Sequence, residues 1–129
     1  LTPNSEEGLN ALVKLLNDNP NITIELSAHT DLVGNDADNK QLSLRRAQSV
    51  VDYLIKHGIE SARLTPVGYG EEKPVVVDEQ LHKQYSFLPK DQVLDEAFIT
   101  TISADKQEVC NSLNRRTEFR VLKTTYNLY

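Results

Sequence analysis

The sequence predicts an α+β domain in which helices pack on one face of a small mixed β-sheet. Apolar residues recur at helical spacing in two stretches, and short segments with strand character lie between and after them. In chain order these segments run helix, strand, helix, strand, strand, which favours a single layer of helices on a sheet. At 129 residues the chain fits one compact domain, residues 1–129.

The first predicted helix begins near Thr2 and Pro3 and ends before Asn19. Thr2 is expected to cap the free N–H groups of the helix, and proline suits the first helical position. A strand follows over residues 22–28, where apolar and polar residues alternate. The buried face of the helix is expected to consist of Leu9, Leu12, Val13 and Leu16.

A second helix is predicted from about Asn39, with Gly58 as its stop. Residues 63–68 then form a short second strand. Proline lacks the N–H group that an inner strand needs, so Pro66 confines this strand to a sheet edge or a bulge. The Gly-Tyr-Gly segment at 68–70 is expected to end the strand in a turn.

The last strand is predicted at residues 117–123, where charged and apolar side chains alternate. The stretch before it, residues 75–113, is less regular. We interpret it as a helical insertion within the domain, with short helices at Leu81 to Tyr85, Asp95 to Ile102 and Asp105 to Leu113.

Composition excludes several classes of function. The net charge of −5 argues against nucleic acid or anionic lipid as a general partner. Cys110 is the only cysteine, so no intrachain disulfide or cysteine-based zinc site can form, and its helical phase predicts a place in the core. No apolar run is long enough to span a membrane and no signal-peptide pattern opens the chain. Residue 1 is Leu rather than Met, which is consistent with an excised fragment.

A charged junction between the first strand and the second helix is the candidate site. Asp31 follows the strand and Arg46 lies about two turns into the helix, so both can reach one cleft at the edge of the sheet. Together an Asp and an Arg suit a zwitterionic amino-acid group. The alternative is that they pair with each other and only orient the turn. Of Arg115 and Arg116, at most one is expected to face the same cleft, because neighbours on an extended chain diverge.

The sequence offers no catalytic, metal or cofactor motif. Counted from Asp31, the acids of the turn do not match the positions of an EF-hand loop, and the histidines are scattered. His29 either lines the cleft or is a satisfied structural histidine at a strand end. There is no GxSxG, GxGxxG or Walker loop, so neither a hydrolase nor a nucleotide-binding protein is predicted.

Read together, these motifs are similar to the OmpA-like peptidoglycan-binding domain, a family that includes peptidoglycan-associated lipoproteins and flagellar motor stator proteins. The resemblance covers about residues 1–74 and 111–123. It rests on the order of "HTD" 29–31, Gly34, Asn39, "LS" 42–43, "RA" 46–47, Val50, Leu54, Gly58, "GYG" 68–70, Pro74 and "NRR" 114–116.

The resemblance implies a non-catalytic periplasmic domain that anchors the outer membrane to the cell wall by binding the diaminopimelate of peptidoglycan stem peptides. Asp31 and Arg46 match the acid and the arginine that bind this ligand in the family. The parent protein is then expected to be attached to the outer membrane. The remaining residues implied for the pocket are Asn39, Arg116, Thr30 and Leu42.

Two departures from the family pattern matter. The family usually begins with a strand before the first helix, whereas this sequence starts at the helix boundary. That strand is expected to be trimmed, replaced or supplied by a partner, and an exposed sheet edge can result. The insertion at 75–113 is longer than usual and resembles variants in Bacteroidetes outer-membrane proteins. The alternative function is therefore a protein–protein interaction module of an envelope complex that uses this insertion, with an envelope protein or a second copy as partner.

Overall fold

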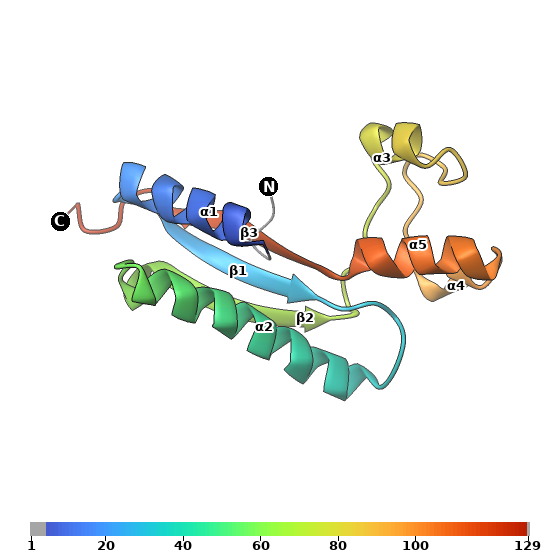
Figure 1. Cartoon of the computed structure of the whole chain (residues 1–129), viewed down its shortest axis with the longest axis horizontal. Coiled ribbons are helices and arrows are strands. Elements are labelled where there is room, and N and C mark those ends of the chain that lie inside the picture. Colours follow the sequence, from blue (N-terminus) through green and yellow to red (C-terminus); the bar gives the residue numbers. More distant parts are fainter. Residues whose placement is uncertain (1–4, 129) are drawn as a thin grey trace.

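The computed structural model describes residues 5–128 and shows an α+β fold with a three-stranded mixed sheet (Figure 1), which confirms the predicted fold class. The elements are α1 (Glu6–Asp18), β1 (Thr23–His29), α2 (Asp36–Lys56), the 3-10 turn η1 (Ser61–Arg63), β2 (Leu64–Gly70), α3 (Glu79–Gln84), α4 (Glu96–Ile99), α5 (Ala104–Asn114) and β3 (Arg116–Lys123).

The sheet has the strand order β2-β1-β3, with β1 in the centre. β1 runs parallel to β2 and antiparallel to β3. Pro66 lies on β2, opposite Leu26, and therefore on an edge strand, as its missing N–H group predicts.

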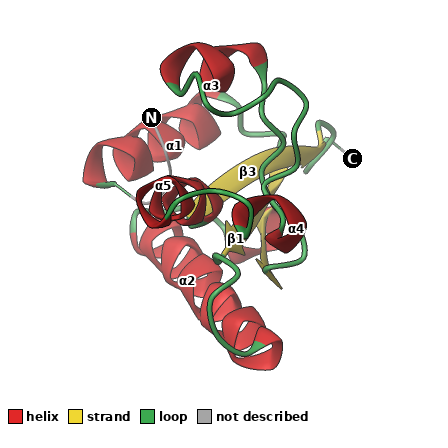
Figure 2. Ribbon diagram, turned by 90° about the vertical axis from the view of Figure 1, so that its right-hand side faces the viewer, coloured by secondary structure: helices red, strands yellow, loops and turns green. Residues whose placement is uncertain are grey.

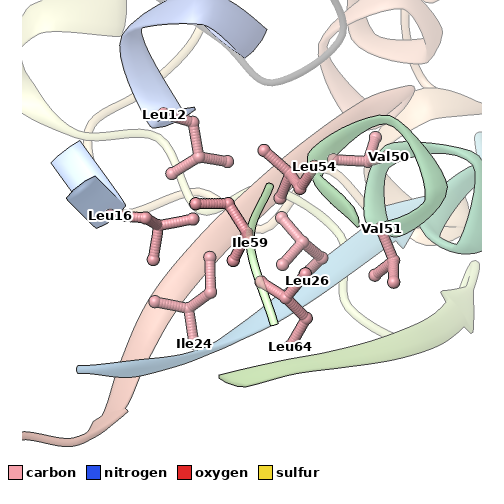
Figure 3. Packing of buried hydrophobic residues seen from close by; sticks show 9 residues of the cluster. All are labelled: Leu12, Leu16, Ile24, Leu26, Val50, Val51, Leu54, Ile59 and Leu64. Carbon is pink, nitrogen blue, oxygen red and sulfur yellow. The ribbon is translucent and has the colours of Figure 1, made fainter. Parts of the chain in front are cut away.

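α1 and α2 lie together on one side of the strands (Figure 2), and the main core fills the space between these helices and the sheet (Figure 3). Alternate residues of β1 face the helices, which explains the strand-period pattern in the sequence. The buried members of this core are Leu12, Leu16, Ile24, Leu26, Val50, Val51, Leu54, Ile59 and Leu64.

The helix starts differ from the expected ones. The prediction for Thr2 and Pro3 falls outside the described residues; the described helix begins at Glu6, and the Ser5 side chain accepts a hydrogen bond from the Gly8 N–H. α2 begins at Asp36, three residues before the predicted start, because the Asn35 side chain caps it. A capping asparagine followed by acids near the positive helix end is a start signal in its own right.

The Gly-Tyr-Gly segment does not form the predicted turn; it is the last part of β2. The glycine at 68 is needed for packing, since a Cβ there would lie 2.3 Å from the backbone nitrogen of Leu44 on α2. Gly70 has φ of +58°, in the left-handed region that glycine adopts readily. The segment thus lets α2 approach the strand closely.

The insertion lies beyond the carboxyl end of β1 (Figure 1) and has a core of its own. The three expected short helices are present as α3, α4 and α5, and Val76 pairs with Val93 in an isolated bridge. Leu32, just after β1, packs against this second core and so joins the insertion to the candidate site. Its buried members are Val77, Leu88, Leu94, Ile99 and, as predicted, Cys110.

β3 forms the other edge of the sheet, and in the described part of the chain no strand pairs with its outer side. Phe119 and Val121 are paired with Leu26 and Ile24, so they point to the helix side, yet they are 40% and 47% exposed. The expected exposed edge is therefore at β3. No helix in the described region has the length and apolar character of a membrane span.

Candidate ligand-binding site

A cavity of about 270 Å³ opens where β1 ends. One wall comes from α2, through Arg46, and the opposite wall comes from the junction of α5 and β3. The cavity thus lies at the end of the sheet where β1 finishes, which is where the charged junction was predicted. Its lining residues are His29, Arg46, Arg115, Arg116 and Thr117.

Asp31 sits beside this cavity and is held in place by two hydrogen bonds. Its Oδ2 accepts from Nη1 of Arg115 at 2.7 Å, and its Oδ1 accepts from the Val33 N–H at 3.0 Å. The Asp31 side chain is only 14% exposed. The alternative in which Asp31 pairs with Arg46 is wrong, because the arginine partner of Asp31 is Arg115.

Arg46 differs from the two other arginines that line the cavity. Arg115 contacts Asp31 and Glu108, and Arg116 forms an ion pair with Glu118. The Arg46 side chain is exposed and has no hydrogen bond or ion pair with any residue in the described range 5–128. It is therefore the cavity's uncompensated positive charge.

Both arginines of the Asn-Arg-Arg segment line the cavity, which corrects the expectation that at most one would. Arg115 is the C-cap of α5, with φ −77° and ψ 93°, whereas Arg116 is the first residue of β3. The two residues thus belong to different elements, and the divergence of neighbours along one strand does not apply to them. Arg116 also donates to the Lys73 carbonyl at 2.9 Å, which fixes its guanidinium.

His29 lines the cavity and is not the satisfied structural histidine that was one alternative. Its side chain is buried, and neither ring nitrogen has a hydrogen-bond partner among the described residues. The ring stacks on Tyr69 at a centroid distance of 5.3 Å. Burial, together with the positive charge of Arg116, lowers the pKa of His29 to about 4, so the imidazole is neutral at neutral pH.

Of the predicted pocket residues, Arg46 and Arg116 line this cavity and Asp31 lies beside it, whereas the other three do not line it. Asn39 is buried, and its side-chain amide donates to the Val33 carbonyl at 3.0 Å, which closes the loop that carries Asp31. Thr30 is buried and donates from Oγ1 to the Asp31 carbonyl. Leu42 is half-buried on α2. Asn39 and Thr30 therefore shape the backbone around Asp31.

Sequence reasoning considered Arg115 but left it out of the implied pocket, and it missed Glu108. The signal for Arg115 was its place at the end of a predicted helix, where the chain turns before entering a strand. Glu108 lies two helical turns before Arg115, so both residues fall on one side of α5. No group of three His, Cys, Asp or Glu side chains that could hold a metal ion is present in the part of the chain described.

Sequence comparison relates this chain to outer-membrane proteins. Residues 1–86 match the sequence model of the OmpA family. The chain is 42% identical over 73 residues to outer membrane porin F of Pseudomonas fluorescens, covering 57% of this chain and 22% of that protein. It is 40% identical over 77 residues to outer membrane protein A of Shimwellia blattae, covering 58% of this chain and 32% of that protein. The chain thus spans less than a third of either relative.

Structural comparison finds the same fold in envelope proteins. The peptidoglycan-associated lipoprotein of Burkholderia pseudomallei superposes with a TM-score of 0.61 at 23% identity, covering 90% of this chain and 75% of that one. A MotB-like protein of Desulfovibrio vulgaris gives 0.61 at 24% identity, with coverages of 100% and 66%. The resemblance of the insertion to Bacteroidetes variants stays a prediction. The match over residues 1–86 shows that the chain belongs to the OmpA family, whose domains are non-catalytic binding modules of the cell envelope.

Proposed function

We propose that this domain binds peptidoglycan without catalysis, by holding the zwitterionic end of the diaminopimelate side chain in a stem peptide. The observation that carries the proposal is the charge arrangement of the site. Arg46 is an uncompensated cation on one wall of the cavity, and Asp31 is a fixed carboxylate beside the opposite wall. A ligand that carries an ammonium and a carboxylate on one carbon complements both charges.

Each charge of the ligand has its own counterpart. The guanidinium of Arg46 can form two parallel hydrogen bonds to the ligand carboxylate, which a lysine at this position could not. Asp31 attracts the ammonium and accepts its hydrogen bonds. Because Asp31 is already held by Arg115 and by the Val33 N–H, little rotational freedom is lost when the ligand binds.

Selectivity follows from the same two charges. A stem peptide with lysine in place of diaminopimelate has the amine but no carboxylate, so Arg46 would be desolvated without a partner. Arg116 also lines the cavity, and Glu118 offsets its positive charge through an ion pair. Asn39 and Thr30 act by holding the loop of Asp31, and Leu42 supplies apolar surface on α2 next to Ser43.

The proposal places the domain in the periplasm as a wall anchor of a longer envelope protein. The name peptidoglycan-associated lipoprotein of one structural neighbour, and the description of another from Pseudomonas aeruginosa as a cell wall anchor, support this placement. The second neighbour superposes with a TM-score of 0.57 at 21% identity. Attachment of the parent protein to the outer membrane is part of the same proposal.

The test is calorimetric titration of the domain with a stem peptide that contains diaminopimelate, alongside the lysine-containing peptide. Arg46→Ala and Asp31→Asn should each weaken binding by about 2–5 kcal/mol, the usual cost of removing one partner of a desolvated charge pair. Arg45→Ala is the matched control, because Arg45 precedes Arg46 on α2 and does not line the cavity.

Folding of each variant is checked by circular dichroism and thermal unfolding, since Asp31 also anchors its loop. Saturable binding that survives in Arg45→Ala and is lost in Arg46→Ala supports the proposal. A well-folded wild-type domain that binds neither peptide contradicts it and favours the alternative, a protein–protein interaction module that uses residues 75–113.

A further inference from the structure

Arg115 bridges two carboxylates at the mouth of the cavity. Its Nη1 donates to Asp31 Oδ2 at 2.7 Å, and its Nη2 donates to Glu108 Oε1 at 2.6 Å. Glu108 lies on α5 and therefore belongs to the insertion, whereas Asp31 follows β1. The insertion thus reaches the ligand-binding acid through one arginine.

The bridge matters because Arg115 alone would cancel the charge of Asp31. A carboxylate paired with a guanidinium at 2.7 Å forms a neutral pair, which attracts a ligand ammonium only weakly. The second carboxylate, Glu108, returns the cluster to one net negative charge. Across the cavity, Arg46 has no ion-pair partner among the described residues, so the site as a whole carries one negative and one positive end.

Two further features support this distribution of charge. Glu108 and then Asp31 raise the pKa of Arg115 above its usual value, because both carboxylates accept hydrogen bonds from its guanidinium. Arg115 is also the C-cap of α5, where the negative end of the helix dipole favours a cation and adds to the negative surroundings of the guanidinium. Arg116 does not disturb this balance, because it pairs with Glu118.

We infer that Glu108 is a specificity-determining residue: by neutralising Arg115, it preserves the attraction of Asp31 for the ammonium group of the ligand. The insertion at 75–113 thereby has a part in ligand recognition, through charge rather than through contact with the ligand. This inference rests on the proposed function and names a residue outside the segments on which the family resemblance is based.

The test compares Glu108→Gln with wild type by titration with the diaminopimelate stem peptide at low ionic strength. The substitution keeps the side chain's size and removes its charge, so binding should weaken about two- to fivefold, as expected for one partly exposed charge. The loss should shrink at 0.5 M salt, where charges are screened within a few ångströms. Asp105→Asn is the matched control, since it removes an exposed acid of α5 that has no ion pair with any described residue.

A second comparison separates a charge effect from a structural one. Glu108→Gln combined with Arg115→Gln leaves Asp31 as an unpaired carboxylate and restores the net charge of the cluster, so affinity should return towards that of wild type. With a stem peptide whose diaminopimelate side-chain amine is acetylated, Glu108→Gln should bind at least as tightly as wild type, because the ligand keeps its carboxylate and no longer carries the ammonium.

The outcomes distinguish this inference from the proposed function. If wild type and Glu108→Gln bind the unmodified peptide equally at low salt, or if Glu108→Gln weakens the acetylated peptide to the same extent, the inference is overturned and the proposed function stands. A wild-type domain that binds no stem peptide overturns both. Equal thermal stability of Glu108→Gln and wild type is expected throughout, because Glu108 is exposed.

Discussion

Ser43 on α2 and Gly70 on β2 are joined by a buried hydrogen bond, in which the Gly70 N–H donates to Ser43 Oγ at 2.9 Å. The same hydroxyl donates to the Lys40 carbonyl at 2.8 Å, so it satisfies a strand end and a helix turn together. This contact fixes the helix that carries Arg46 against the sheet, one helical turn from that arginine. The geometry of the cavity therefore depends on a residue that does not line it.

Ser43→Ala should destabilise the domain by about 1–3 kcal/mol, because the Gly70 N–H is left buried without a partner. Urea unfolding followed by circular dichroism measures the change. Ser49→Ala is the control: Ser49 lies on the same helix, is exposed, and its hydroxyl donates to the Arg45 carbonyl of its own helix, so its loss should cost less than about 0.5 kcal/mol. Equal costs for the two variants would contradict the role assigned to Ser43.

Gly68→Ala should destabilise the domain more than the addition of a single methyl group suggests. The added Cβ would lie 2.3 Å from the Leu44 nitrogen and 2.7 Å from its Cα, and backbone atoms of a helix cannot move aside independently. We expect a loss of about 1–3 kcal/mol or more in unfolding free energy, the usual range for overpacking. Thr65→Ala, at an exposed position of the same strand, should be nearly neutral. An unchanged stability in Gly68→Ala would show that α2 can move away from β2 at little cost.

The order and type of the elements could be predicted from periodicity because the main core is amphipathic in the simplest way: α1 and α2 each bury one face, and β1 buries alternate residues against them. The role of the Gly-Tyr-Gly segment could not be predicted in this way. Glycines commonly mark turns, and only the position of α2 in space shows that Gly68 serves a close approach between a helix and a strand.

Arg63 illustrates another contact that local patterns do not reveal. It is buried, and its guanidinium donates to the carbonyl groups of Leu16, Asn19 and Ile22, where α1 ends and β1 begins. Arg63→Ala should cost about 3–5 kcal/mol, because the Leu16 and Ile22 carbonyls lose the donor that the arginine supplies, while the Asn19 carbonyl keeps the Ile22 N–H at 3.3 Å.

Arg63→Lys separates charge from geometry, since a lysine ammonium cannot reach three carbonyls with a planar fork. It should recover less than half of the stability lost in Arg63→Ala, as measured by chemical unfolding. Full recovery in the lysine variant would mean that charge alone is sufficient at this position.

For the site, the sequence could place Asp31 and Arg46 at one sheet edge, but it could not identify their partners. The pairing of Asp31 with Arg115 joins residues far apart in the chain and depends on where α5 ends. Local spacing carries no information on such a contact. The same holds for His29, whose ring stacks on Tyr69 and finds no hydrogen-bond partner within residues 5–128.

His29 should make the domain's stability depend on pH in a defined window. Its pKa is lowered from 6.5 to about 4 in the folded state, by burial and then by Arg116. Between these two pH values the unfolded chain binds a proton at His29 that the folded chain does not. The contribution of His29 to stability is therefore fully present above pH 6.5 and is lost as pH falls towards 4. At about 1.4 kcal/mol per pH unit, the largest possible loss is about 3 kcal/mol.

The measurement is the free energy of unfolding at pH 7.5, 6.0 and 4.5 for wild type and His29→Phe, which keeps a ring stacked on Tyr69 but cannot be protonated. Carboxylates titrate in both proteins, so the difference between the two curves isolates the histidine. This difference should shift in favour of the variant as pH falls from 6.5 to 4.5. A constant difference between wild type and His29→Phe over this range would mean that the buried imidazole is protonated as readily in the folded domain as in the unfolded chain.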